Sequence, residues 1–224
     1  MLLELRKTLK ASHDPTYHPE QFFKEPIKVY SIRTPVVRKI AKEYFPKQLK
    51  HPELLVHCTE LWKSGMFEEC VVAMEWAERA KMKEFDVFES WLKNYATNWA
   101  HVDGLCGSLI GPLLEEHPEL IPRVKAWHMS KNRWVRRASA VAFVVPGRHG
   151  KYLADIFDIS IKLMKDEDDL VQKAYGWALK EACHHHEKEV FQFVMKHKKI
   201  MPRTALRYAI EKMPKELKSR AMEK

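Results

Sequence analysis

The sequence predicts an all-α fold made of stacked pairs of helices. Apolar residues recur at steps of three and four through most of the 224 residues, as at Ile156, Ile159 and Leu163, and this is the period of a helix. Only seven residues are glycine, fewer than a chain rich in tight hairpin turns needs, and no segment alternates convincingly as a strand does. With 46% hydrophobic residues, the chain has enough apolar material for a packed core.

Helix-breaking residues divide the chain into segments of helical length, about 10–18 residues each. In chain order the breaks fall at Pro15 and Pro19, Pro46 and Pro52, Gly65, Pro118 and Pro122, Gly147 and Gly150, and the acidic residues 166–169. We expect the acidic run to form a loop that also caps the next helix, because its carboxylates can accept hydrogen bonds from free N–H groups at a helix start.

One short pattern recurs along the chain: a small residue, two variable residues, a bulky residue and a second small residue. Its copies are residues 37–41 (the weakest), 73–77, 107–111, 138–142, 174–178 and 205–209, with starts 36, 34, 31, 36 and 31 residues apart. Small residues at i and i+4 let two helices approach closely, and this spacing holds two helices with their turns. We therefore expect a single domain over residues 1–224, an α-solenoid of about six HEAT-like two-helix repeats. An irregular helical bundle is the alternative.

The net charge of +9 is distributed in bands along the chain. Residues 1–50, 120–154 and 196–224 carry +6, +8 and +7, whereas residues 51–119 and 155–195 carry −8 and −4. Basic residues stand just before several copies of the pattern: Arg33, Arg136, Arg137, Lys173 and Arg203. In register they are expected in the first turns of equivalent helices, where free N–H groups favour anions. The row predicts a nucleic-acid partner, although any one of these residues taken alone is better explained as a solvated surface residue.

Residues 98–103, Asn-Trp-Ala-His-Val-Asp, contain the main candidate for chemistry. Asn98 is expected to cap a helix on which Trp99 and Asp103 share a face. Asp103 is the only acidic residue between Glu89 and Glu115, and it lies among apolar residues and glycines, where a carboxylate is costly without a partner. The alternative interpretation is a structural aspartate bonded to a neighbouring helix end.

Four motifs follow one another along nearly the whole chain. They are Ile-Arg-Thr-Pro at residues 32–35, Asn-Trp-x-x-Val-Asp at 98–103, Trp-Val-Arg-Arg-Ala at 134–138 and Gln-Lys-Ala-Tyr-Gly-Trp-Ala at 172–178. In this order and spacing the chain resembles the AlkD-like family of DNA alkylation-repair glycosylases, which are HEAT-like-repeat proteins. The resemblance implies hydrolysis of the N-glycosidic bond of cationic N3- and N7-alkylpurines in duplex DNA, without a metal or an organic cofactor, as the first step of base excision repair.

The resemblance also implies roles for single residues. Asp103 matches the catalytic aspartate of the family, and Trp99 and Trp177 match two cleft tryptophans that contact the sugar of the damaged nucleotide. Arg137 matches the arginine that binds the backbone beside the lesion, with Arg136 as the alternative. Without the resemblance, Trp177 is better explained as part of the core.

Two positions depart from the family pattern. Phe22 stands about where the family often has a cleft tyrosine, and Ser31 replaces the glycine usual before the Ile-Arg-Thr-Pro run. Both departures fall at the N-terminal edge of the expected cleft and leave Asp103 unaffected.

The remaining features indicate compartment and partners. The four cysteines are scattered without metal-finger spacing, no apolar run approaches the ~20 residues needed to cross a bilayer, and the charged start is unlike a signal peptide. The three histidines 184–186 point in different directions on a helix, so we expect a solvated helix terminus there and no metal site. We expect a cytoplasmic monomer with a concave basic cleft that binds alkylated double-stranded DNA and no membrane. A noncatalytic HEAT-like module that binds DNA structures or a protein partner is the alternative.

Overall fold

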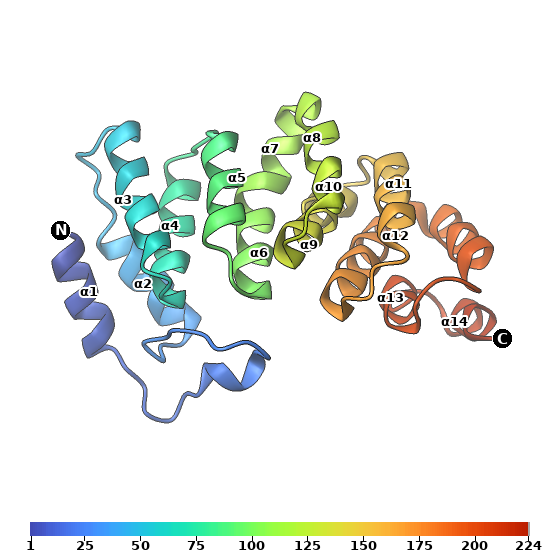
Figure 1. Cartoon of the computed structure of the whole chain (residues 1–224), viewed down its shortest axis with the longest axis horizontal. Helices are drawn as coiled ribbons and strands as arrows, with labels where there is room; N and C mark the ends of the chain where they lie inside the picture. The colour runs from blue at the N-terminus through green and yellow to red at the C-terminus, as the bar shows by residue number, and fades with distance from the viewer. Residues whose placement is uncertain (224) are drawn as a thin grey trace. The chain divides into compact units, whose positions relative to one another are not determined.

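The computed structural model describes residues 1–223, and its regular structure is helical (Figure 1). Among these residues there is no strand, only an isolated parallel bridge between Lys28 and Met66. None of the described helices is long and apolar enough to cross a membrane. The four cysteines are free thiols, and all but Cys183 are buried. Because the described residues form helices and no strand, the predicted all-α fold is confirmed.

Met1–Leu109 form the first of two compact units. Its elements are α1 (Leu2–Ala11), the 3-10 helix η1 (Pro19–Phe22), α2 (Thr34–Glu43), α3 (His51–Lys63), α4 (Phe67–Arg79), α5 (Phe85–Asn94) and α6 (Trp99–Leu105). Each even-numbered helix packs on the helix before it, and α4 also packs on both α2 and α6. The second helices of successive pairs thus form one layer, as in a HEAT-like solenoid.

Ile110–Lys224 form the second unit, and a π-helical turn, η2 (Cys106–Ile110), contains the division. Its further elements are α7 (Gly111–Glu116), η3 (Pro118–Leu120), α8 (Ile121–Ala126), η4 (Trp127–Met129), α9 (Arg133–Val141), α10 (Val144–Arg148), α11 (Leu153–Leu163), α12 (Asp169–His197), α13 (Arg203–Ala209) and α14 (Lys215–Met222). Here α12 packs on α9, α11 and α13, which repeats the arrangement of stacked helix pairs. A single domain over residues 1–224 stays a prediction.

The long helix α12 is two helices joined by a kink at His186, whose φ of −135° and ψ of 41° are not helical. The imidazole Nε2 of His186 lies 3.0 Å from the carbonyl oxygen of Gly150. The three histidines therefore mark a helix end, as predicted.

The recurring small-residue pattern lies on the second helix of each pair. Its copies fall on α2, α4, α9 and its end, α12 and α13, and the copy at residues 107–111 runs from the π-helical turn into α7. The small residues of the five purely α-helical copies are almost wholly buried: Ala41, Ala73, Ala77, Ala138, Ala142, Ala174, Ala178, Ala205 and Ala209. The prediction that these residues mark helix–helix contacts is confirmed.

Gly176, inside one copy, shows how closely two second helices approach. A Cβ atom at this position would lie 2.6 Å from the carbonyl oxygen of Ala205 and 2.7 Å from Cβ of Tyr208, both on α13. Neither atom is the end of a flexible side chain, so only a movement of the helix could make room. Glycine is therefore required for the observed contact between α12 and α13.

We expect Gly176→Ala to lower the free energy of unfolding by about 1–3 kcal/mol, because overpacking against backbone exceeds the gain in helix propensity. Gly107→Ala is the matched control, since a Cβ at Gly107 meets no atom within 4 Å. Urea unfolding of both variants measures the difference. Equal stability of the two variants would contradict the close contact.

Candidate functional site

Helix α6 holds two of the predicted site residues one turn apart. The buried Asn98 caps the helix, and its side-chain oxygen accepts a hydrogen bond from the N–H of His101 at 2.9 Å, as expected for an N-cap. Trp99 is the first residue of α6 and Asp103 follows four residues later, so both lie on one face. Both side chains are half-buried. The carboxylate of Asp103 is therefore neither sealed in the core nor fully solvated.

Two phenylalanines from the N-terminal segment contact Trp99. The indole N–H of Trp99 donates a hydrogen bond to the carbonyl oxygen of Phe22 at 3.3 Å. The ring of Phe23 stacks on the indole, with 5.2 Å between centroids and 18° between planes. The Phe22 side chain itself is 60% exposed. The structure thus brings Phe22 and Trp99 together, through the backbone of Phe22.

A pocket of about 360 Å³ opens beside Trp99, and all its lining residues belong to the first unit. It is lined by Tyr17, Pro19, Phe22, Phe23, Thr34, Arg38, Phe67, Val71, Met74, Glu75, Trp99, Ala100, Gly104 and Ser108. Five of these residues are aromatic. Asp103 is not in the lining, but its neighbour Gly104 is, so the carboxylate belongs to the adjoining stripe of the same helix.

The segment that carries Phe22 and Phe23 is anchored by a buried carboxylate. Glu68 on α4 is fully buried and accepts hydrogen bonds from the N–H groups of Tyr30 and Ile32 at 2.9 and 3.1 Å. Burial raises the pKa of Glu68 above its usual range. Between the two N–H groups, Ser31 has a φ of 58°, in the left-handed region. A glycine at this position would avoid strain, so the serine noted in the sequence carries a conformational cost.

Arg33 follows this anchored turn and is held by side chains of the same segment. It forms an ion pair with Asp14, with 2.9 Å between Nε and Oδ2, and its guanidinium lies over the ring of Tyr17. As the N-cap residue of α2 it lies at a helix start, as predicted. Its side chain remains more than half exposed, so contact with an anion requires no unfolding of the segment.

His101 lies beneath the site in an aromatic cage. Its ring stacks on Phe67 and packs edge-on against Trp62. Its Nδ1 lies 3.2 Å from the side-chain nitrogen of Asn98, whereas its buried Nε2 has no hydrogen-bond partner. Burial lowers the pKa of His101 to about 4. The imidazole is therefore neutral at physiological pH and acts as a packing residue.

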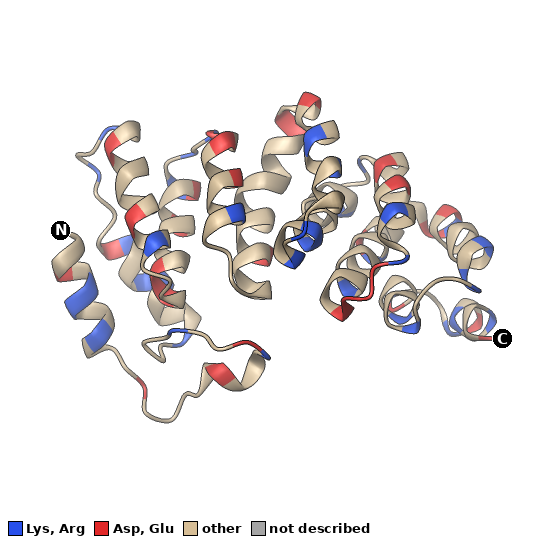
Figure 2. Ribbon diagram, in the orientation of Figure 1, with Lys and Arg blue, Asp and Glu red and all other residues tan. Residues whose placement is uncertain are grey.

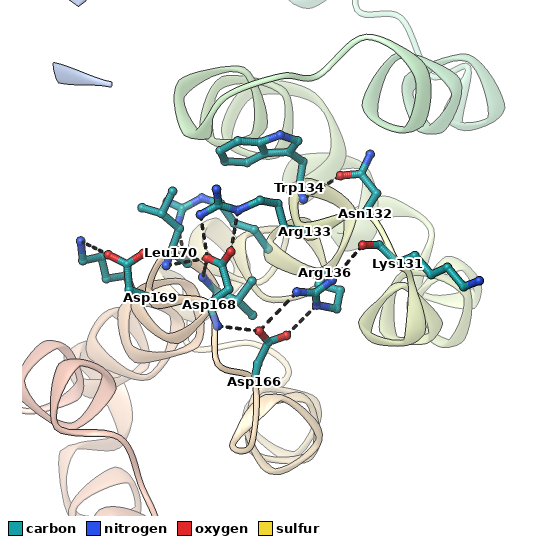
Figure 3. A network of polar contacts seen from close by, with 12 residues as sticks. Lys131, Asn132, Arg133, Trp134, Arg136, Asp166, Asp168, Asp169 and Leu170 are labelled. Carbon is teal, nitrogen blue, oxygen red and sulfur yellow. Dashed lines mark hydrogen bonds and ion pairs between the residues drawn. The ribbon is translucent and has the colours of Figure 1, made fainter. Parts of the chain in front are cut away.

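The basic residues of α9 are bound to the acidic run before α12 (Figure 3). The guanidinium of Arg136 pairs with Asp166 at 2.6 Å and also donates to two backbone carbonyls of the preceding turn. Arg133 pairs with Asp168. Asp168 in turn accepts from the N–H of Leu170 at 2.9 Å and caps α12. The predicted capping role of the acidic run is confirmed, and the run also neutralises part of the basic band.

The remaining predicted DNA-binding residues are held in different ways. Arg137 is 5% exposed and donates a hydrogen bond to the carbonyl of Leu170. Lys173 forms an ion pair with Asp169 at 3.2 Å, and the exposed Arg203 donates to the carbonyl of Met222 at 3.4 Å.

The placement of these residues in first helical turns is confirmed for some of them and wrong for others. Arg203 is the first residue of α13, and Arg33 caps α2. Arg136, Arg137 and Lys173 are the fourth and fifth residues of α9 and α12, beyond the first turn and its free N–H groups. The reason is that Asn132 caps α9 and Asp168 caps α12, so each helix starts several residues before these cations. Figure 2 shows α9 with basic and no acidic residues, and the acidic loop before α12.

Trp177 on α12 is half-buried and has a carboxylate partner. Its indole N–H donates to Glu181 at 3.1 Å, one turn later on the same helix. The buried Glu181 also pairs with Arg148 at 2.8 Å. Trp177 is therefore oriented by a hydrogen bond and is not a purely apolar core residue.

Sequence reasoning missed three residues around these side chains: Phe23, Tyr17 and Glu181. The four-residue spacing from Trp177 to Glu181 was a usable signal, because such pairs meet on a helix. Phe23 and Tyr17 lie in an irregular segment, where no periodicity indicates which side chain turns inward. Tyr17 supplies a phenol to the same pocket as Phe22, the position at which the family tyrosine was expected.

Comparisons with known proteins agree with this architecture. Residues 5–213 match the family model of DNA alkylation repair enzymes, and the chain belongs to that family. A solved structure described as a predicted DNA alkylation repair enzyme from Enterococcus faecalis has the same fold, with a TM-score of 0.76 and 17% sequence identity. That match covers 88% of this chain and 93% of the other. No curated protein matches the chain.

The low pKa of His101 predicts a pH-dependent stability. Because the unfolded imidazole binds a proton near its ordinary pKa of 6.5 and the folded one only near 4, the free energy of unfolding should fall as the pH drops between these values. We expect a loss of up to about 3 kcal/mol from this group. Urea unfolding at pH 7, 5.5 and 4.5 measures it. His101→Phe should flatten this part of the profile, and an unchanged profile would contradict a neutral buried imidazole.

The left-handed conformation of Ser31 predicts a stabilising substitution. Ser31→Gly should raise the free energy of unfolding by up to about 1 kcal/mol, because it removes the strain of a Cβ at positive φ. Ser31→Ala is the control, since alanine keeps the Cβ atom. Thermal unfolding compares the two variants, and a gain for alanine equal to that for glycine would show that strain is not the cause.

Proposed function

We propose that the protein is a DNA glycosylase that hydrolyses the N-glycosidic bond of cationic N3- and N7-alkylated purines in double-stranded DNA. The observation that carries the proposal is Asp103, a half-buried carboxylate one helical turn from Trp99, in a chain of the DNA alkylation repair enzyme family. The support is that this spacing puts a carboxylate and an indole ring on one helix face, and both groups can stabilise the positive charge that develops on the sugar.

The alkylated purine already carries a positive charge, so the leaving group needs no general acid. When the bond between C1′ and the purine nitrogen breaks, its electron pair goes to the purine, which leaves uncharged, and the sugar becomes an oxocarbenium ion. A water molecule then adds to C1′ and loses a proton. Asp103 would stabilise the positive sugar and orient the water, roles for which one carboxylate suffices. We propose no metal or organic cofactor in this reaction.

The indole rings of Trp99 and Trp177 would contact the damaged nucleotide. An electron-rich indole face attracts a cation, and the attraction grows as water is excluded. The hydrogen bonds of Trp99 to Phe22 and of Trp177 to Glu181 hold the two rings in place before DNA binds. Preorganised side chains bind with a smaller entropy cost than mobile ones.

The DNA backbone would be bound by basic residues of both units. Arg33 and Arg203 are the exposed members of the predicted set, and a phosphate could reach them although Arg33 pairs with Asp14 and Arg203 with the carbonyl of Met222. Lys173, Arg136 and Arg137 are less exposed, and they too would exchange a partner within the protein for a phosphate. Each phosphate contact should appear in the salt dependence of DNA affinity.

Substitution of the carboxylate tests the proposal. We expect Asp103→Asn to slow the release of 7-methylguanine and 3-methyladenine from methylated duplex DNA by about a hundredfold or more, because the amide carries no charge to stabilise the oxocarbenium ion. Affinity for the same DNA should change little. Chromatography of the released bases measures the rate, and fluorescence anisotropy the affinity.

Glu43→Gln is the control, since it removes an exposed carboxylate from the same unit. It should excise at the parent rate. Equal excision by Asp103→Asn and the parent protein would remove Asp103 from the reaction. Tight DNA binding without base release, even by the parent protein, would favour the noncatalytic alternative.

A further inference from the structure

A buried carboxylate beside Trp177 gathers cationic side chains that the proposed function does not use. Glu181 on α12 is 3% exposed. Its Oε1 accepts a hydrogen bond from the indole N–H of Trp177 at 3.1 Å, and its Oε2 accepts one from Nε of Arg148 at 2.8 Å. Nζ of Lys212 lies 3.7 Å from Oε1. One carboxylate thus joins the ring that would contact the sugar to two cations of the same unit.

These residues occupy equivalent positions in successive repeats. Glu181 and Lys212 stand seven residues after the start of the small-residue pattern in their repeats, and Arg148 and His184 stand ten residues after it. On α12, Trp177, Glu181 and His184 follow at steps of four and three, so they share one helix face. Nζ of Lys212 lies 2.9 Å from Nε2 of His184. The cations therefore form a row along the face to which Trp177 belongs.

Close packing of α10 on α12 determines where the Arg148 side chain begins. A Cβ atom at Gly147 would lie 2.9 Å from Cδ1 of Ile156 and 3.6 Å from the carbonyl oxygen of Ala178. The glycine therefore lets α10 approach α12 at the residue that follows Trp177. Arg148, the next residue of α10, begins beside the same turn of α12.

The guanidinium of Arg148 is held at Nε and open at its other two nitrogens. In the part of the chain that the structure describes, neither Nη group donates a hydrogen bond, and half of the side chain is exposed. Burial alone would raise the pKa of Glu181, but the hydrogen bonds from Arg148 and Trp177 outweigh it and lower that pKa. The carboxylate is therefore charged and orients the guanidinium, whose planar fork of Nη groups matches two oxygens of a phosphate.

The charge of this cluster favours an anion. Arg148 and Lys212 supply two positive charges against the single negative charge of Glu181, and their side chains are 50% and 43% exposed. The neighbouring Lys180 pairs with Glu211 at 3.2 Å, and that pair carries no net charge. The cluster therefore presents one net positive charge on an accessible surface.

We propose that Arg148, with Lys212 beside it, binds a phosphate of the DNA backbone next to the sugar that Trp177 contacts. The proposal rests on the proposed function, which places DNA against Trp177. Arg137, which the resemblance assigns to the backbone, is 5% exposed, whereas Arg148 offers an accessible guanidinium in the same unit. Because Glu181 contacts both Trp177 and Arg148, one nucleotide can meet the indole with its sugar and the guanidinium with its phosphate.

The salt dependence of binding to a short undamaged duplex tests the phosphate site. Arg148→Gln keeps a hydrogen-bond donor for Glu181 but removes the charge and the fork. We expect it to weaken binding roughly fivefold to tenfold at about 0.1 M salt. The slope of log affinity against log salt should become shallower by about one, as for the loss of one phosphate contact. Fluorescence anisotropy measures both quantities.

Lys162→Gln is the matched control. It removes one positive charge from α11, where Lys162 pairs with Asp158 one turn earlier, so it should leave the slope unchanged. Lys212→Gln removes the second cation of the cluster and should lower the slope in the same direction as Arg148→Gln. A parent slope in the Arg148→Gln variant overturns the proposal.

A measurement on the parent protein makes the test independent of how the variants fold. Phenylglyoxal modifies accessible arginines, and mass spectrometry of the digested protein locates the modified residues. The duplex should protect Arg148 and leave the exposed Arg123 of α8 reactive. Equal modification of Arg148 with and without bound DNA also overturns the proposal.

The two proposals can fail separately. If the parent protein releases 7-methylguanine while Arg148→Gln keeps the parent slope, the glycosylase stands and the phosphate site fails. If Arg148→Gln lowers the slope while the parent protein releases no base from methylated DNA, the phosphate site stands and the glycosylase fails. If the parent protein does not bind duplex DNA, both fail.

Discussion

The close contact between successive second helices is the constraint on which both units depend. Each pair buries small residues against the next pair, and at Gly176 even one methyl group would collide with the backbone of α13. A larger side chain cannot be introduced at such a contact, because the backbone of the facing helix does not move aside as a flexible side chain does. The same stacking places α6 against α4 and so determines which face of α6 remains accessible.

Two sets of hydrogen bonds shape the accessible face of α6 into the candidate site. The side chain of Asn98 starts the helix at Trp99, and the four-residue spacing then puts Asp103 on the same face. From the other side, the carboxylate of Glu68 binds the backbone at residues 30 and 32, which anchors the segment that carries Phe22 and Phe23. Without the Asn98 cap, Trp99 would not be held at the start of α6. Without the hydrogen bonds to Glu68, the segment that carries Phe23 would not be held against the indole of Trp99.

Many charged side chains of this protein form ion pairs with one another. The acidic residues 166–169 cap α12 and pair with Arg133, Arg136 and Lys173, so two arginines of the central basic band are neutralised by this run. Exposed cations such as Arg33 and Arg203 keep the capacity to meet phosphate. A count of basic residues therefore overestimates the positive field that DNA would encounter.

The sequence by itself determined the features that depend on neighbours along the chain. The helical period, the buried small-residue pattern, the Asn98 cap with Trp99 and Asp103 one turn apart, and the capping acidic run all follow from spacing of a few residues. Only the tertiary structure decided that Phe23 stacks on Trp99, that Glu68 holds a turn 38 residues earlier in the chain, and that Arg136 pairs with Asp166. These contacts join segments far apart in sequence, and no local periodicity records which partner a side chain will meet once the helices have packed.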